Sequence, residues 1–478
     1  MMTTVNHSAL GGSYHNPEDA SSRIQLRRAI ILVLMSLVIP GSAQLVQGNR
    51  RLGMNAVRVW LGSGLIAVLL LILSAVSRSL FLSLVMNPVV LKLGQWALIA
   101  LAVGWAYVIF DAWRLGRPLE QKSAHRIAGT AVGTVSILGM AGTLIFASHA
   151  VAVVNEVSGD VFVSGAVSKP HDGRYNILLL GTDSGKDRTG MRPDSINIAS
   201  VDAETGRAVL IGLPRNLQNV PFPEGSVMNQ EFPNGFDCEG CYLNAVNTWA
   251  HDHADRFDED DPGIHATMEA VEEVTGLSLN YYALVNMKGF SKLVDSVGGV
   301  RINVRERTAI GGIGSPIRGW IEPGEQQLTG DQALWYARSR VMNDDWSRMG
   351  RQKCVLNAMV QQLNPQKVLL NMGDIAKSGS AMISTDIPRQ DMSVFVNLAL
   401  DTRKQPLSSV SVVPPVINTA DPDYAKVRRL ISTAIEESEA IGTPRANLET
   451  ATLKPVDDSP EVKDPKKVNQ SKNLDTVC

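Results

Sequence analysis

The sequence predicts an α/β sandwich with a central sheet, preceded by a helical membrane anchor. Charge is distributed unevenly: residues 1–155 hold 12 Lys and Arg against 4 Asp and Glu, while the whole chain of 478 residues has a net charge of −2. This first part also contains long uncharged stretches, and strand-like and helix-like segments alternate after it. A basic, apolar front followed by a polar remainder is typical of an anchored protein, and alternating strands and helices are typical of α/β folds.

Four stretches in the first part contain no Asp, Glu, Lys or Arg. Each reaches the roughly 18–20 residues that a helix needs to cross about 30 Å of hydrocarbon. The first begins too late and is too long for a cleaved signal peptide, and further apolar stretches follow it. We therefore predict membrane helices within Ala29–Asn49, Val59–Ser77, Leu93–Phe110 and Ile127–Asn155.

Positive charge between these stretches predicts their orientation. Residues 47–58 carry three arginines and residues 111–126 carry four basic residues, whereas residues 78–92 carry two. The positive-inside rule places the two more basic loops in the cytoplasm and everything after Asn155 outside.

The first stretch leaves two topologies open. Four spans would place the N-terminus outside, whereas Arg23, Arg27 and Arg28 favour the inside. Pro40–Gly41 interrupts the stretch, so it forms either a full span or a re-entrant hairpin that leaves three spans.

Composition divides the chain into five parts. From Gly442 onward Pro, Asp, Lys, Asn and Ser dominate without periodicity, which is typical of disorder. The parts are a cytoplasmic or flexible N-terminus at 1–28, a membrane domain of three or four spans at 29–155, a connector at 156–174, an extracytoplasmic α/β domain at 175–440 and a disordered tail at 441–478.

The elements of the α/β domain follow from apolar periodicity and turn residues. Short apolar runs predict strands at Tyr175–Leu180, Ser195–Val201, Ala208–Leu213, Tyr281–Val285, Val300–Val304 and Ser408–Val413. Helical spacing predicts helices at Thr267–Thr275, Phe290–Ser296, Thr329–Arg338, Arg348–Leu363 and Asp423–Glu437, and another within Val368–Ala381. The polar segment Glu322–Leu328 is predicted to be a turn.

Arginines and aspartates gather in residues 176–216 and 336–352, beside strand-like runs and a helix start. Guanidinium groups match phosphate oxygens two at a time and keep their charge. Aspartates would repel the same anion unless a divalent cation lay between, and Mg²⁺ takes carboxylate oxygens together with substrate phosphates. The chemistry therefore predicts a pyrophosphate and a metal at a sheet edge outside the cell.

Two other phosphate-binding classes are excluded. The loop at 184–191 is not a Walker loop, because Gly181 and Gly185 are too close together and Asp187 stands where Ser or Thr is required. The α/β part lacks net positive charge, so no nucleic-acid partner is expected.

The clusters of His, Cys and acidic residues predict local structure in preference to metal sites. The six acids in residues 252–261 predict a solvated face, with calcium binding as the alternative, and His251 and His253 predict a polar loop rather than a metal site. The cysteines Cys238, Cys241, Cys354 and Cys478 all lie outside by this topology, where disulfides persist. At least one bridge is expected within the first three, either Cys238–Cys241 or Cys241–Cys354, and Cys478 is unplaced.

Six sequence blocks over Tyr175–Leu363 resemble the LytR-CpsA-Psr family of cell-envelope proteins, in the family's order. They are LLGTD, RPDSI, IGLPR, NYYALVNMKGFSKLVDSVGGVRINV, PGEQQLTGDQALWYARSR and D-x-x-R-x-x-RQ. The resemblance implies a three-layer α/β/α sandwich with a central mixed sheet. It also implies a phosphotransferase dependent on Mg²⁺ (or Mn²⁺), which moves a glycopolymer from a polyprenyl pyrophosphate carrier onto peptidoglycan at the plasma membrane. The polyprenyl tail would lie in an apolar groove under the sheet.

The resemblance assigns roles residue by residue. Asp183 and Asp194 match the metal-holding aspartates, and Asp345 matches the acid proposed to act as base, with Arg215 beside it in catalysis. The positions matching the pyrophosphate site are Arg192, Arg215, Arg338, Arg340, Arg348, Arg351 and Gln352.

Two positions depart from the family pattern. Asn216 follows Pro-Arg where aspartate is common, and Tyr242 stands where many members have lysine. Two rivals stay open: a hydrolase, since the same site could pass the phosphoryl group to water, and a non-catalytic protein that binds the lipid carrier or regulates, which these two departures make conceivable. The sequence does not select the glycopolymer.

Overall fold

The computed structural model describes residues 22–85, 87–161, 168–183, 192–312, 314–341, 344–362, 383–440, 468–469 and 472–478. The chain forms two compact units, Met1–Asn155 and Glu156–Cys478, which are considered separately. The loop at 184–191 and the helix expected within Val368–Ala381 lie outside the described residues.

The first unit is helical. Three helical stretches are long and apolar enough to cross a membrane: Arg50–Val76, Pro88–Glu120 and Ser123–Glu156. Its helices are α1 (Ser22–Val38), α2 (Ser42–Gln47), α3 (Arg50–Val76), α4 (Arg78–Val85), α5 (Pro88–Leu115) and α6 (Ser123–Val161).

The first apolar stretch is divided between the helices α1 and α2, with the break at Pro40–Gly41, where the sequence predicts an interruption. The chain reverses at Gly41, whose φ of +94° suits glycine. A Cβ added to Gly116, just past the end of α5, would meet Ala29 of α1, and one added to Gly48, just past α2, would meet Leu115. The middle of α1 and the end of α2 therefore lie beside the same end of α5.

A six-stranded mixed sheet forms the centre of the second unit, in the order β10-β3-β2-β1-β4-β9. β1 pairs in parallel with β4 and β3 with β10, and the other neighbours are antiparallel. The strands are β1 (Arg174–Thr182), β2 (Pro193–Asp202), β3 (Ala208–Leu213), β4 (Tyr281–Asn286), β9 (Ile383–Thr385) and β10 (Ser408–Ser411).

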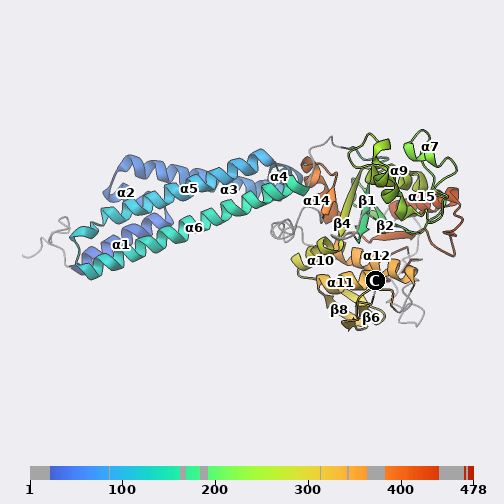
Figure 1. Ribbon diagram of the computed structural model, residues 1–478. Coiled ribbons are helices and arrows are strands. Elements are labelled where there is room, and N and C mark those ends of the chain that lie inside the picture. Colours follow the sequence, from blue (N-terminus) through green and yellow to red (C-terminus); the bar gives the residue numbers. More distant parts are fainter. Residues whose placement is uncertain are drawn as a thin grey trace, which may run out of the picture. The chain divides into compact units, whose positions relative to one another are not determined.

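Helices cover both faces of this sheet, which confirms the predicted three-layer α/β/α class (Figure 1). Alternation along β1 directs Leu178 and Leu180 into the core with α9 (Pro262–Thr275) and α15 (Tyr424–Ala440), whereas Leu179 faces the other layer. That layer contains α10 (Met287–Ser296), α11 (Gly330–Arg338), α12 (Asp345–Gln362) and α14 (Met392–Thr402). The shorter helices α7 (Val227–Glu231) and α8 (Val246–Asp252) lie in the connection between β3 and α9.

Two small two-stranded sheets form a second core beside α10, α11 and α12. β5 (Val300–Val304) pairs with β8 (Gly324–Leu328), and β6 (Thr308–Ile310) pairs with β7 (Gly319–Ile321). The predicted turn at Glu322–Leu328 is therefore wrong for most of its length. Burial alternates along β8: Gln326 and Leu328 face inward, whereas the residues before and between them are exposed, as in an edge strand.

Helix α12 is polar in sequence and yet buried. Lys353 is 1% exposed, and its amine donates to the backbone oxygen of Val410 at 3.0 Å and to the hydroxyl of Ser411. Gly212 of β3 leaves space for it, since a Cβ there would lie 3.1 Å from the Cε of Lys353. Among the described residues no acid pairs with this amine, and hydrogen bonds stabilise its charged form.

Residues 472–478 depart from the predicted disordered tail. Leu474 is fully buried, its backbone N–H donates to Leu407 at 3.0 Å, and Lys472 accepts from Ser409 at 3.1 Å. Cys478 forms a disulfide with Cys354 in α12, so the expected alternative Cys241–Cys354 is wrong. The other alternative, Cys238–Cys241, is present.

Lys353 should make the free energy of unfolding depend on pH. Burial lowers the pKa of Lys353 from 10.5 to about 7. Between these values the unfolded chain binds more protons, so stability rises with pH. Relative to Lys353→Met, the wild type should gain about 4 kcal/mol between pH 7 and 10.5.

Urea unfolding of the full chain in detergent, followed by tryptophan fluorescence at several pH values, measures this difference. Lys426→Met, which removes an exposed lysine, is the control. A constant difference between wild type and Lys353→Met across this range would contradict the assignment.

Candidate functional site

The ends of three strands meet at one edge of the sheet. β1 ends at Thr182, followed by Asp183, and β3 ends at Leu213, two residues before Arg215. β2 runs antiparallel to both, so its first residues, including Asp194, lie at the same edge. The strand register therefore brings together residues that are 32 positions apart in sequence, from Asp183 to Arg215.

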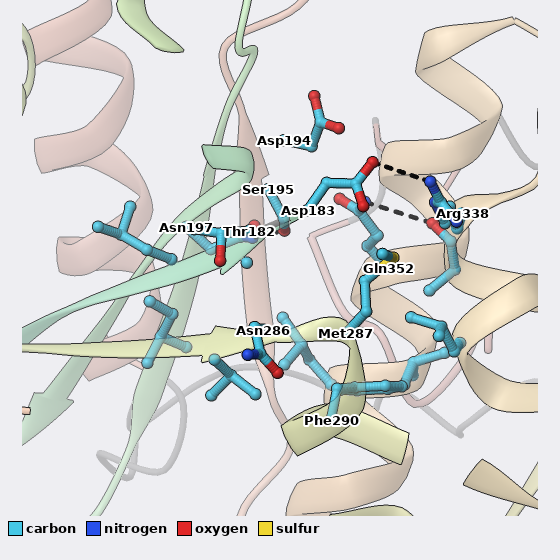
Figure 2. A pocket seen from close by; sticks show the side chains of 18 of the residues that line it. Thr182, Asp183, Asp194, Ser195, Asn197, Asn286, Met287, Phe290, Arg338 and Gln352 are labelled. Atoms are coloured by element: carbon cyan, nitrogen blue, oxygen red, sulfur yellow. Dashed lines mark hydrogen bonds and ion pairs between the residues drawn. The ribbon is translucent and has the colours of Figure 1, made fainter. Parts of the chain in front are cut away.

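The helical layer supplies the other side of the site. Arg338, the last residue of α11, donates from Nη2 to Asp183 Oδ2 at 2.9 Å and so joins the helix end to the sheet edge (Figure 2). The guanidinium of Arg338 also lies 5.2 Å from the ring centre of Trp335, one turn earlier in α11. The ion pair and the aromatic ring together hold this arginine at the sheet edge.

Asp345, the first residue of α12, is the centre of the charge cluster. Arg348 lies 3.0 Å from its carboxylate, Arg340 lies 3.6 Å away and Arg215 lies 3.8 Å away. Arg215 also pairs with Asp194. One carboxylate therefore faces three guanidinium groups, and positive charge is in excess around it.

Arg348 is the most deeply buried of these three arginines, and one of its hydrogen-bond donors is unused within the described ranges. It is 3% exposed, and its Nε atom has no hydrogen-bond partner among the described residues. Burial lowers the pKa of Arg348, and the charge of Asp345 opposes that change. A buried cation with an unused donor is expected where an anion binds.

A cavity of about 270 Å³ opens at this cluster and extends between the sheet and the helices α10, α11 and α12. Figure 2 shows Asp183 and Asp194 at one end of it, with Phe290 and Met287 further along. Its lining is mainly apolar, whereas Asp183, Asp194, Arg338 and Arg348 line its charged end. This shape suits an amphiphile with a long apolar chain and an anionic head. The apolar lining includes Leu179, Leu180, Ala283, Val285, Met287, Phe290, Leu293, Leu334, Val355, Leu356 and Met359.

Two of the residues expected at the pyrophosphate already have protein partners, and a third is exposed. Arg192 is exposed immediately before β2, and Gln352 lines the cavity while donating to the backbone oxygen of Ala337 at 3.3 Å. Arg351 is 2% exposed, and each of its three nitrogens has a protein acceptor. The geometry therefore assigns Arg351 to holding the protein rather than to contacting an anion.

Asp183 and Asp194 fit a magnesium ion only in part. Both carboxylates line the charged end of the cavity, and each pairs with an arginine. Within the described ranges no group of three His, Cys, Asp or Glu side chains could hold a metal. Two carboxylates suffice for Mg²⁺ when substrate phosphates complete its coordination.

The two departures from the family pattern lie close to Arg215 in sequence or structure. The Oδ1 atom of Asn216 is buried, and no hydrogen-bond partner for it occurs among the residues that the structure describes. Tyr242 is half-buried just before the turn whose Asn244 N–H donates to the backbone oxygen of Arg215 at 3.0 Å.

Other polar groups have local roles. Asp344 accepts from the N–H and hydroxyl of Ser347 and so caps α12, and Asp261 caps α9. His253 stacks on Trp249 at 4.1 Å, and no metal cluster forms around it within the described ranges.

The cavity lining was missed from the sequence. Val355, Leu356 and Met359 have helical spacing directly after the arginines of α12, which signals an apolar face continuing from a charged helix start. Ser195 and Asn197 were hidden in an apolar strand, and only the pairing of β2 shows that they face the cavity. Trp335 stands three residues before Arg338, a spacing at which helical side chains meet.

Comparison with known proteins gives one family match. The model of the LytR_cpsA_psr family matches residues 143–427, more than half of the chain. The teichoic acid transferase TagU of Oceanobacillus iheyensis, named as a polyisoprenyl-teichoic acid–peptidoglycan transferase, is 27% identical over 224 residues, covering 46% of this chain and 61% of that protein. TagU of Enterococcus faecalis is 29% identical over 234 residues, covering 48% and 66%. The chain thus spans less than two thirds of these relatives.

Solved structures are similar at lower identity. Bacillus subtilis TagV has a TM-score of 0.41 and 20% identity, and the match covers 56% of this chain and 98% of that one. A structure described as TagT bound to LI-WTA has a TM-score of 0.36 and 17% identity, covering 57% and 93%.

Removing the carboxylate of Asp345 should make the stability of the protein depend on a bound anion. Asp345→Asn leaves Arg348 buried without its nearest counter-charge, so the free energy of unfolding should fall by about 2 kcal/mol, a value reduced for the partial exposure of Asp345. Sulfate should restore more stability to the variant than to the wild type.

Thermal unfolding in sulfate and in chloride of equal ionic strength measures this. Asp331→Asn, which breaks an exposed pair with Arg318, is the matched control. Equal stabilisation of Asp345→Asn and wild type by sulfate would show that the arginine excess does not bind anions.

Proposed function

Because the chain belongs to the LytR-CpsA-Psr family, we propose that it transfers a glycopolymer from a polyprenyl pyrophosphate carrier onto peptidoglycan during cell-wall assembly. The observation that carries the proposal is an apolar cavity with two arginines and two aspartates at one end, which belong to an ion-pair cluster of four arginines and three aspartates. The names of the relatives TagU add support, since they describe transfer from a polyisoprenyl carrier to peptidoglycan.

The donor would bind with its two ends in different surroundings. The polyprenyl tail enters the apolar cavity, where burial of each CH₂ stabilises the complex by roughly 0.8 kcal/mol. The pyrophosphate lies at the charged end, against Arg215, Arg338, Arg340 and Arg348. The unused Nε of Arg348 gains an acceptor there.

Donor binding would also release the carboxylates. Phosphate oxygens compete with Asp345 for its three arginines, which frees this carboxylate to take a proton. An acceptor hydroxyl on peptidoglycan then attacks the phosphorus next to the glycopolymer, and its proton passes to Asp345. The bond from that phosphorus to the polyprenyl phosphate breaks, polyprenyl phosphate leaves, and a phosphodiester remains.

Asp183 and Asp194 would hold Mg²⁺ (or Mn²⁺) together with phosphate oxygens. When bound, the cation supplies positive charge that offsets the charge of the pyrophosphate. Arg338 and Arg215, which pair with these aspartates, would turn to the phosphates.

The helical unit supports a location at the plasma membrane. Three long apolar helices would anchor the protein in the plasma membrane, and the positive-inside rule places the α/β domain on the extracytoplasmic side. The two disulfides are compatible with that oxidising side. Teichoic acid, which the relatives' names mention, is the first donor polymer to test.

Arg215→Ala should abolish transfer, because the bound phosphate loses a charged hydrogen-bond partner worth about 2–3 kcal/mol in a partly buried site. The full chain in detergent is given a labelled oligosaccharide on polyprenyl pyrophosphate, Mg²⁺ and peptidoglycan fragments. Label on the fragments supports the transferase, and Arg256→Ala, which removes a distant exposed arginine, should leave it unchanged.

The same assay separates the rivals. Free sugar phosphate without labelled fragments would identify a hydrolase, and lipid binding without turnover would identify a carrier-binding protein. Normal transfer by Arg215→Ala would refute the site assignment.

Asp194→Asn should raise the Mg²⁺ concentration needed for half-maximal transfer about tenfold or more, because a neutral amide replaces a charged ligand. Titrating Mg²⁺ in the transfer assay measures the change, and Asp202→Asn at the far end of β2 is the control. An unchanged titration would mean that the cation is held elsewhere.

A further inference from the structure

The last turn of α11 is held by side chains from one turn of α12. Arg351 donates from Nε to the backbone oxygen of Tyr336 at 2.7 Å and from Nη2 to the backbone oxygen of Ser339. Gln352 donates to the backbone oxygen of Ala337 between them. The end of a helix leaves its last carbonyls without partners in the helix, so these contacts satisfy groups that would otherwise be buried and unpaired.

The third nitrogen of Arg351 is fixed from another direction. Its Nη1 donates to Glu306 at 3.0 Å, in the connection between β5 and β6. The guanidinium therefore joins two helices and a loop through three nitrogens in a rigid plane. A lysine amine carries the same charge on one atom and cannot span these three acceptors.

The segment that Arg351 holds carries two arginines of the anion site. Arg338 lies between the two carbonyls bound by Arg351, and Arg340 follows directly after the second. Arg338 pairs with Asp183, and Arg340 pairs with Asp345. The directions in which these two arginine side chains point therefore depend on the position of residues 336–340.

We propose that Arg351 is a positioning residue that aims Arg338 and Arg340 at the anion, through the carbonyls of Tyr336 and Ser339. The proposal rests on the proposed function for the identity of that anion. Arg351 itself does not contact the anion, because it is 2% exposed and all three of its nitrogens are engaged. Its two closest neighbours in the motif, Arg348 and Gln352, line the cavity. The same turn of α12 therefore carries residues that can meet a ligand and one that holds the end of α11 in place.

Binding of farnesyl pyrophosphate with Mg²⁺ tests the proposal, measured by calorimetry on the full chain in detergent. Arg351→Lys should weaken binding about tenfold or more, the loss expected when charged groups lose their alignment. Arg307→Lys, an exposed arginine paired with Glu322, should bind as the wild type does.

A double-mutant cycle distinguishes positioning from general loss of structure. Because Arg340 is one of the two arginines that Arg351 positions, Arg351→Lys should cost less binding in the Arg340→Gln background than in the wild type. Additive losses would overturn the proposal, because independent sites add. If Arg351→Lys does not fold, Glu306→Gln takes its place in the cycle, since it removes the counter-charge of Arg351 and keeps the side-chain shape.

Hydrogen exchange without ligand provides the second readout. Arg351→Lys should speed amide exchange in residues 336–341 and leave the central sheet unchanged; unchanged exchange at 336–341 would overturn the proposal. Failure of the wild type to bind farnesyl pyrophosphate, with faster exchange in the variant, would instead count against the proposed function and retain the structural link.

Discussion

The structure of the second unit depends on burying the polar helix α12. Arg348, Arg351 and Lys353 are each at most 3% exposed, and each is held differently: by a carboxylate, by backbone carbonyls with a carboxylate, and by hydroxyls and a carbonyl. Removing charges from water is costly unless hydrogen bonds replace the solvent. The end of α11 and strand β10 supply such bonds to Arg351 and Lys353, and the Cys354–Cys478 disulfide joins residues 472–478 to the same helix. In this layer, the elements that pack against α12 are therefore also the ones that supply hydrogen bonds to its buried charges.

The same burial produces the site. Asp345, at the start of α12, faces three arginines, one of which also pairs with Asp194, and the cavity beside this cluster is mainly apolar. Water screens the buried Arg348 less than it would at an open surface, so an anion gains more from this arginine. An apolar chain attached to that anion gains independently from the cavity. A ligand with both parts binds more tightly than either part would, which gives a physical reason for a lipid-linked pyrophosphate in preference to free phosphate.

Much of the fold was predictable because its signals are local. The strands Ala208–Leu213 and Val300–Val304 were predicted with the bounds that the structure has, since each is a short apolar run between turn residues. β8 was not, because its stability comes from pairing with β5 rather than from its own polar sequence. The burial of Leu474 was also hidden, since a single apolar residue in a polar tail gives no period. Tertiary partners decide such cases.

In the site, the sequence predicts which residues gather, whereas the tertiary structure decides the role of each. The arginines and aspartates were found from their types and from the family resemblance, and the structure brings Arg215, Arg338, Arg340 and Arg348 together with three aspartates. Arg351 has the same side chain and lies three residues from Arg348, but its guanidinium meets backbone oxygens instead. Sequence spacing placed both on one helix face, and only the position of the end of α11 decides which of them meets a ligand. A charged motif in a buried helix therefore contains both contacts and supports, and burial separates them.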